Sequence, residues 1–135
     1  MAGQSLRLVL VTPETTLFDE PVAALRFPLH DGQIGILPGR APMIGRLGYG
    51  ELKLTRLDGG EASYFVDGGF VQVKAEAVTL LTDRALSRDE IDATEAAAEL
   101  QQAVGRVAKT DAEAAARARD QERARQMLAM AGTGR

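Results

Sequence analysis

The sequence contains no cysteine and only one histidine among its 135 residues. Without cysteine, the chain can form neither a disulfide framework nor a site in which thiolates bind a metal ion. It also lacks an apolar run long enough to cross a bilayer. The opening residues, MAGQSLRLVLVT, do not have the charged-then-apolar order of a signal peptide. We therefore expect a mature chain that starts here, in a bacterial cytoplasm or an equivalent compartment, and that spans no membrane.

Neither acidic nor basic residues are in large excess. The formal net charge is −3, and 45% of the residues are hydrophobic, which is ordinary for a soluble chain. A net negative charge gives no support to nucleic-acid binding. About half of this length can already bury a usable core, so we expect one domain with an appendage.

Residues that carry catalytic chemistry are scarce. His30 stands beside Asp31, but the nearby sequence offers the pair no nucleophile and no metal partner, which favours a solvent-facing or interface histidine. The glycines form neither GxxxxGKS/T nor GxGxxG, so no phosphate-binding loop is indicated. We expect a protein that is not an enzyme and that has no metal site.

Residues 6–84 have the pattern of short strands separated by turns. Polar and apolar residues alternate over 51–57, and Asp58-Gly59-Gly60 supplies a turn to a returning strand over 62–66. Asp67-Gly68-Gly69 is expected to break the chain again before the next strand. Turns at this spacing predict a β-sandwich or barrel of roughly eight to ten short strands.

Glycine and proline are dense between Asp31 and Gly50, yet large apolar residues lie between them. A flexible linker would be polar, and a helix would not tolerate so many breakers. The segment predicts a shaped, partly buried region of turns and strands, in which glycine admits unusual backbone angles and proline restricts others.

From Ser87 onward alanine dominates, and Gly105 is the only glycine before Gly132. Two tetrapeptides, SRDE at 87–90 and TDAE at 110–113, match the capping box that starts a helix. We expect helices over about 88–108 and 111–130, folded back as an antiparallel hairpin. The expected domains are a β-sandwich over residues 1–86 and a helical hairpin over residues 87–135.

The apolar stripe expected between these helices is thin. Its large members are Ile91, Leu100, Val104 and Val107 on the first helix and Met127 and Leu128 on the second. Alanine, which favours helix strongly but buries little area, fills the rest. Two interpretations stay open: a hairpin that leaves the β domain without unfolding it, and a permanently docked tail. Acidic groups early in the first helix are expected beside arginines late in the second.

Several motifs together resemble the epsilon subunit of the F-type ATP synthase, whose mitochondrial equivalent is called delta. They are VTPE at 11–14, GQIGILPG at 32–39, SYFVDGGFVQV at 63–73 and VTLLTDRA at 78–85, followed by the two-helix tail. The resemblance implies an all-β plus α fold, in which an N-terminal β-sandwich of about ten short strands precedes a C-terminal antiparallel two-helix hairpin.

The same resemblance implies a non-catalytic subunit of the central stalk. The β domain would join the gamma subunit to the c-ring at the cytoplasmic face of the bacterial inner membrane, coupling proton flow to ATP synthesis. The hairpin would reach the alpha and beta subunits and regulate ATP hydrolysis. The candidates for contact with the c-ring, carried over by resemblance, are His30, Asp31, Gln33, Arg40 and Pro42. Arg40 stands where the family usually has histidine, and its guanidinium could still form charge-assisted hydrogen bonds with the ring.

Some members of this family bind ATP on the hairpin through an IDxxRA motif. The matching positions here are Ile91, Asp92 and Ala96, with Arg123 on the second helix, but Glu95 replaces the arginine of the motif. A carboxylate beside a polyphosphate reverses the electrostatic interaction. We therefore expect ATP to bind weakly or not at all, and no other cofactor. The alternative to a motor subunit is a stand-alone sensor, in which the β-sandwich binds a small molecule and the hairpin reports the event.

Overall fold

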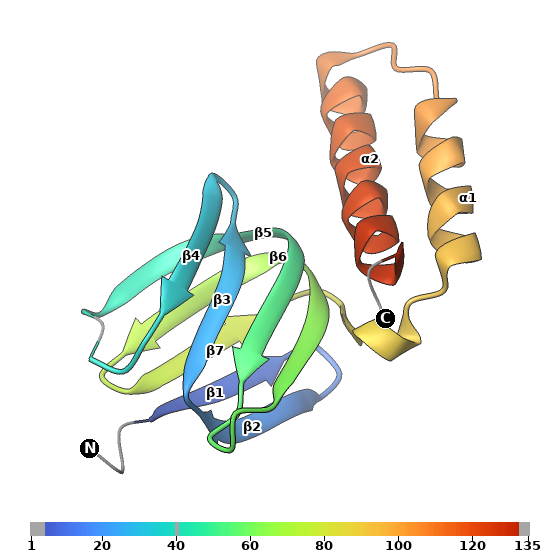
Figure 1. Ribbon diagram of the computed structural model, residues 1–135. Helices are drawn as coiled ribbons and strands as arrows, with labels where there is room; N and C mark the ends of the chain where they lie inside the picture. Colours follow the sequence, from blue (N-terminus) through green and yellow to red (C-terminus); the bar gives the residue numbers. More distant parts are fainter. Residues whose placement is uncertain (1–4, 40, 133–135) are drawn as a thin grey trace. The chain divides into compact units, whose positions relative to one another are not determined.

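A computed structural model describes residues 5–39 and 41–132. The chain folds into two compact units, Met1–Ser87 and Arg88–Arg135, so the boundary falls one residue after the expected position. Figure 1 shows that the first unit is built of strands and the second of helices. Each unit is held together mainly by contacts within itself.

The β unit contains eight strands within the described residues. They are β1 (Leu6–Val11), β2 (Thr16–Val22), β3 (Ala24–Leu29), β4 (Gly32–Ile36), β5 (Met43–Thr55), β6 (Glu61–Lys74), β7 (Ala77–Leu81) and β8 (Ala85–Ser87). Their order is β2-β1-β7-β6-β5-β3-β4, and β8 pairs with β6. The pair of β1 and β7 is parallel, whereas the other pairs are antiparallel.

The core of the β unit follows from the alternation of side chains along its strands. On β1, Leu6, Leu8 and Leu10 are fully buried, whereas Arg7 between them is exposed. Each of β1 to β7 contributes at least one buried apolar side chain to the same cluster. The predicted β-sandwich followed by two helices is confirmed, with eight described strands in place of about ten.

The smaller number of strands has a simple cause in β5 and β6. The expected break at Asp67-Gly68-Gly69 is wrong, because β6 runs without interruption from Glu61 to Lys74 and pairs along its length with β5. Gly68 and Gly69 take positive φ angles of 71° and 113°, which glycine adopts without the strain that a side chain would cause. A Cβ on Gly69 would overlap the carbonyl oxygen of Leu81 on β7. These glycines therefore keep one long strand paired where a turn was expected.

The helical unit contains a short 3₁₀ turn, η1 (Arg88–Glu90), and two helices, α1 (Ala93–Val104) and α2 (Asp111–Gly132). The expected start of the first helix near residue 88 is wrong. Ser87 belongs to β8, whereas Asp92 caps α1 by accepting hydrogen bonds from the backbone N–H groups of Thr94 and Glu95 at 2.8 and 3.2 Å. An aspartate in this position satisfies N–H groups that the helix itself leaves free.

The second expected capping box forms with Thr110 as the cap, except that its glutamate binds the N–H of the residue before the cap. The Thr110 hydroxyl accepts a hydrogen bond from the N–H of Glu113 at 3.0 Å, as the motif predicts. The Glu113 carboxylate reaches back to the N–H of Lys109 at 2.7 Å. The preceding helix ends at Val104 with Gly105 as its C-cap, earlier than the expected end near residue 108.

Candidate interaction surfaces

Six large apolar side chains lie exposed among the described residues of the β unit, and three of them come from the neighbouring strands β5, β6 and β7. Ile44, Phe70 and Leu81 are 77%, 56% and 49% exposed. Phe70 lies directly opposite Leu81 in the sheet, and Ile44 lies opposite Gln72, two residues beyond Phe70 on β6. Val71, between Phe70 and Gln72, is fully buried in the core, so its neighbours point outward. We call the surface formed by Ile44, Phe70 and Leu81 the apolar outer face.

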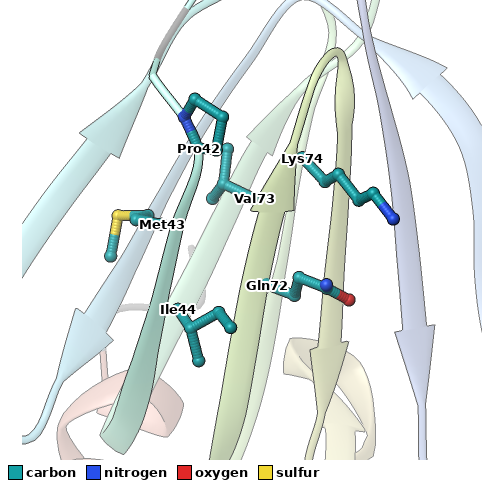
Figure 2. A pocket seen from close by; sticks show the side chains of 6 residues that line it. All are labelled: Pro42, Met43, Ile44, Gln72, Val73 and Lys74. Carbon is teal, nitrogen blue, oxygen red and sulfur yellow. The ribbon is translucent and has the colours of Figure 1, made fainter.

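An open hollow of about 430 Å³ lies where β5 begins and β6 ends (Figure 2). Its lining residues are Pro42, Met43, Ile44, Gln72, Val73 and Lys74. Four of these six are apolar, and Gln72 and Lys74 supply the polar atoms. Because Ile44 belongs to both the hollow and the apolar outer face, the two form one continuous surface. Contiguous exposed apolar surface of this kind marks sites of protein–protein interaction.

Three of the five residues expected to contact the c-ring lie in the tight turn between β3 and β4 or directly after it. His30 and Asp31 form the turn, Gln33 lies on β4 opposite Pro28, and all three expected residues are exposed. The backbone N–H of His30 donates a hydrogen bond to the carbonyl oxygen of Arg46 on β5 at 3.0 Å. The turn is thereby tied to the neighbouring strand, so its side chains project from a supported backbone.

The other two expected contact residues belong to the connection that follows β4. Pro42 is exposed just before β5, and Arg40 lies outside the described residues. Strand β4, from Gly32 to Ile36, puts about 13 Å between the β3–β4 turn and the start of this connection, and the other end of the connection leads into β5, where Arg46 binds His30. In Figure 1 the two segments lie at opposite ends of the β4 arrow. The four described candidates therefore belong to two segments, with His30, Asp31 and Gln33 at the turn and Pro42 before β5.

The buried side chains of the helical unit are small or flexible. Ala96, Ala103, Ala124, Met127 and Met130 are each at most 4% exposed. Of the residues expected in the apolar stripe, Met127 is buried, and Ile91, Leu100 and Leu128 are half-buried. Met130 was missed, although its position three residues after Met127 places it on the same helix face.

Val104 and Val107 were expected to lie in the apolar stripe between the helices. This expectation is wrong, because they are 53% and 74% exposed. Val107 lies beyond the end of α1, in the connection between the helices. Val104 follows the buried Ala103 by one position, which turns its side chain about 100° away from the packed face. The distal end of the hairpin consequently presents two valines to solvent.

The positions that match the nucleotide motif are occupied by other interactions. Asp92 caps α1, Ala96 is buried, and Ile91 is half-buried. On α2, Nη1 of Arg123 donates to Oδ1 of Asp120 at 2.7 Å. The arginine is therefore engaged by a carboxylate of its own helix.

Asp120 is also bound from the other side of the hairpin. Nη1 of Arg106, in the connection after α1, donates to Oδ2 of Asp120 at 2.7 Å. The hydrogen bond from Arg106 is the largest cause of a lowered pKa for the Asp120 carboxyl; partial burial opposes it, and Arg123 adds to the lowering. The sequence pattern had predicted acidic groups on the first helix beside arginines on the second, and this ion pair has the reverse polarity.

Within residues 5–39 and 41–132, no group of three or more His, Asp or Glu side chains is placed to hold a metal ion. None of the described helices combines the length and apolar character needed to cross a membrane.

Comparison with known proteins places the chain in a family. The β-sandwich domain of the ATP synthase delta/epsilon chain matches residues 5–88. An ATP synthase epsilon chain of Rhodopirellula baltica is 46% identical over 110 residues, covering 82% of this chain and 85% of the relative. One from Synechococcus is 36% identical over 124 residues, covering 92% and 89%. The chain belongs to the delta/epsilon family of ATP synthase subunits.

Solved structures agree with this assignment. A chain in the OSCP/F1/c-ring structure of the Euglena gracilis mitochondrial ATP synthase matches with a TM-score of 0.84 and 25% identity, over 93% of this chain and 81% of that one. A chain in the central stalk and c-ring of the Tetrahymena thermophila enzyme shares the fold, with a TM-score of 0.75 and 16% identity. The resemblance inferred from the motifs is confirmed: the chain is a non-catalytic subunit of ATP synthase, and the comparisons give no support to a stand-alone sensor.

Proposed function

We propose that this chain joins the gamma subunit to the c-ring in the central stalk of the ATP synthase, coupling proton flow to ATP synthesis. The observation that carries the proposal is the apolar outer face on a chain of this family. Ile44, Phe70 and Leu81 expose large apolar side chains that water solvates poorly, and burying them against a partner is favourable in proportion to the area covered.

The gamma subunit is the proposed partner of the apolar outer face. The hollow beside Ile44 supplies a concave site into which an apolar side chain of gamma can fit, with Gln72 and Lys74 available for polar contacts at its edge. An apolar centre with a polar rim is the usual anatomy of a protein–protein interface. Pro42 lines the same hollow, which supports its assignment to gamma in preference to the c-ring.

The c-ring is the proposed partner of the β3–β4 turn. His30, Asp31 and Gln33 present exposed polar side chains on a backbone tied to Arg46, which suits contact with polar loops of a ring. A subunit that joins two partners needs two separate surfaces. The turn and the hollow supply these two surfaces, and both lie along the first part of β5, because Arg46, which accepts the His30 hydrogen bond, comes two residues after Ile44 of the hollow.

The hairpin is proposed to contact the alpha and beta subunits and to regulate ATP hydrolysis. Two features support this role: the hairpin is a compact unit by itself, and Val104 and Val107 at its distal end are free to be covered by another surface. We further propose that it binds ATP weakly or not at all, because Arg123 is paired with Asp120 and Glu95 adds a negative charge. Titration calorimetry that gave a micromolar affinity for ATP would contradict this proposal.

The proposed location is peripheral, at the cytoplasmic face of the bacterial inner membrane. This location follows from the proposed contact with the c-ring, since the chain would meet the ring at the ends of its loops.

The first experiment compares the full chain with a fragment that ends at Ser87. This end point keeps β8, whose residues 85–87 pair with β6, and removes only the helical unit. Each protein is added to the purified catalytic head containing gamma, and both binding and ATP hydrolysis are measured. We expect both to bind and only the full chain to slow hydrolysis. Failure of both to bind would overturn the proposed contact with gamma. If both bind and the rates of ATP hydrolysis are equal, only the proposed regulation by the hairpin is overturned.

A further inference from the structure

The distal end of α1 is held by side chains of α2. Nη1 of Arg117 donates to the carbonyl oxygen of Arg106 at 2.9 Å, and Nε2 of Gln121 donates to that of Ala103 at 3.4 Å. The last carbonyl groups of a helix have no partner inside the helix. Gln121 thus binds a carbonyl in the last turn of α1, which also accepts the N–H of Arg106, and Arg117 binds a carbonyl in the connection just beyond α1.

Asp120 lies on the same face of α2 as these two donors. Asp120 and Gln121 follow Arg117 by three and four positions, the two spacings at which side chains are neighbours on a helix surface. Its two carboxylate oxygens each accept one arginine at 2.7 Å, Arg106 from the connection and Arg123 from α2. Asp120 therefore links two guanidinium groups, one from the connection and one from α2, through separate carboxylate oxygens.

These polar contacts are partly shielded from water. The side chains of Arg106, Asp120 and Arg123 are 40%, 27% and 23% exposed. A charge-assisted hydrogen bond is about twice as strong as a neutral one, and a partly covered pair is screened less than a fully exposed one. The ion pair can thus contribute more than surface pairs usually do.

Apolar packing near the same end is slight. Ala103 and Ala124 are buried there, but each offers only a methyl group. Val104 and Val107, the larger apolar residues of this end, are exposed. Closure of the distal end therefore depends largely on the polar contacts.

We propose that Asp120 is a latch that keeps the distal end of the hairpin closed. Its carboxylate links Arg106 to Arg123, which keeps Arg117 and Gln121 within reach of the end of α1. When the link is broken, the end of α1 separates from α2 while both helices persist. The inference concerns the hairpin itself and does not depend on the role of the chain in the ATP synthase.

The test measures the distance between the two helices in the full chain. Since the sequence has no cysteine, Gln102→Cys and Ala118→Cys introduce two unique positions for spin labels, both on exposed residues. Pulsed electron paramagnetic resonance then gives the distribution of distances between the labels. Asp120→Ala is compared with the parent and with Glu122→Ala, a matched control that removes the same charge from α2. The Glu122 carboxylate contacts Gln126 and Arg125, both on its own helix.

We expect the parent and Glu122→Ala to give one narrow distance. Asp120→Ala should raise the population of longer distances about tenfold, with helical circular dichroism retained. An unchanged distribution in Asp120→Ala would overturn the proposal. If that variant instead loses helix, Arg106→Gln decides, because it breaks the same link and leaves Asp120 neutralised by Arg123. A broader distribution of distances in Arg106→Gln than in the parent supports the latch, and a distribution equal to that of the parent contradicts it.

Discussion

Nη1 of Arg106 and Oδ2 of Asp120 lie 2.7 Å apart, so an ion pair bridges the two arms of the hairpin near its turn. The pair joins a residue just beyond α1 to one in the middle of α2. It has a measurable consequence for the dependence of hairpin stability on pH.

The Asp120 carboxyl has a lowered pKa in the folded chain, chiefly because of the hydrogen bond from Arg106. The folded state therefore holds the charged form, and the unfolded state binds the proton more readily. The stability from this group is fully present above the unfolded pKa of about 3.9 and is lost as pH falls through the lower folded value.

The measurement is the unfolding of the parent and of Asp120→Asn at several pH values, followed by helical circular dichroism. Arg106 and Arg123, the charged groups that contact the carboxylate, stay protonated throughout this range. The parent should be more stable by a constant amount above about pH 5, and the difference should shrink below about pH 4. A difference that does not depend on pH would show that the charge of Asp120 is unimportant.

The apolar outer face predicts a second result. Replacing Ile44 or Phe70 by aspartate should weaken binding to gamma by about tenfold or more, since a charge would have to be buried in the interface. Both side chains are more than half exposed, so the free chain should keep its stability. Surface plasmon resonance with the catalytic head gives the affinity.

The matched control for this prediction is Leu57→Asp. Leu57 is 57% exposed in the turn between β5 and β6, away from the proposed interface. Its substitution should leave the affinity unchanged. An equal loss in all three variants would mean that the effect comes from added charge and not from the apolar outer face.

Gly69 predicts a large effect on stability. At its φ of 113°, alanine would be strained, and its Cβ would overlap the Leu81 carbonyl oxygen of β7. Gly69→Ala should therefore cost about 3 kcal/mol or more of unfolding free energy.

Gly59→Ala isolates the conformational part of that cost. Gly59 has a φ of 94° but no atom within 4 Å of the added Cβ, so the loss should be about 1 kcal/mol. Urea unfolding of the fragment 1–87 measures both variants. Equal losses would show that the approach of β7 to Gly69 is not the limiting contact.

Thr110 tests the start of α2. Thr110→Ala removes the hydroxyl that accepts the N–H of Glu113, and should cost the hairpin about 1 kcal/mol. Thr94→Ala, at an exposed position inside α1, should be neutral or slightly stabilising because alanine has the higher helix propensity. Thermal unfolding followed by circular dichroism compares them, and an effect of Thr94→Ala as large as that of Thr110→Ala would argue against capping.

Much of the fold could be predicted because local patterns and tertiary structure agree. The alternation of Leu6, Leu8 and Leu10 identifies a strand with one buried face, and the Thr110 capping box marks the start of α2. The expected break at Gly68 and Gly69 failed because glycine serves turns and close strand contacts equally well. Only the position of β7 beside Gly69 distinguishes the two.

The interaction surfaces were less accessible to sequence reasoning. The sequence pattern did not mark Ile44 and Phe70 as exposed, because their exposure depends on which face of the sheet the rest of the chain covers. The relation of His30 to Pro42 depends on the pairing of the turn with β5, which joins His30 to Arg46, four residues after Pro42. Asp120 gave no signal, because its partner Arg106 comes close only when the hairpin folds.

The central claim is that this chain couples gamma to the c-ring, and ATP-driven proton pumping tests it most directly. Membrane vesicles that carry the ATP synthase depleted of this subunit are supplied with the chain, with the fragment 1–87, or with the double variant Ile44→Asp and Phe70→Asp. The account predicts that the chain and the fragment restore pumping and that the double variant does not. Full pumping in the depleted vesicles, or a chain that binds without restoring pumping, would contradict it.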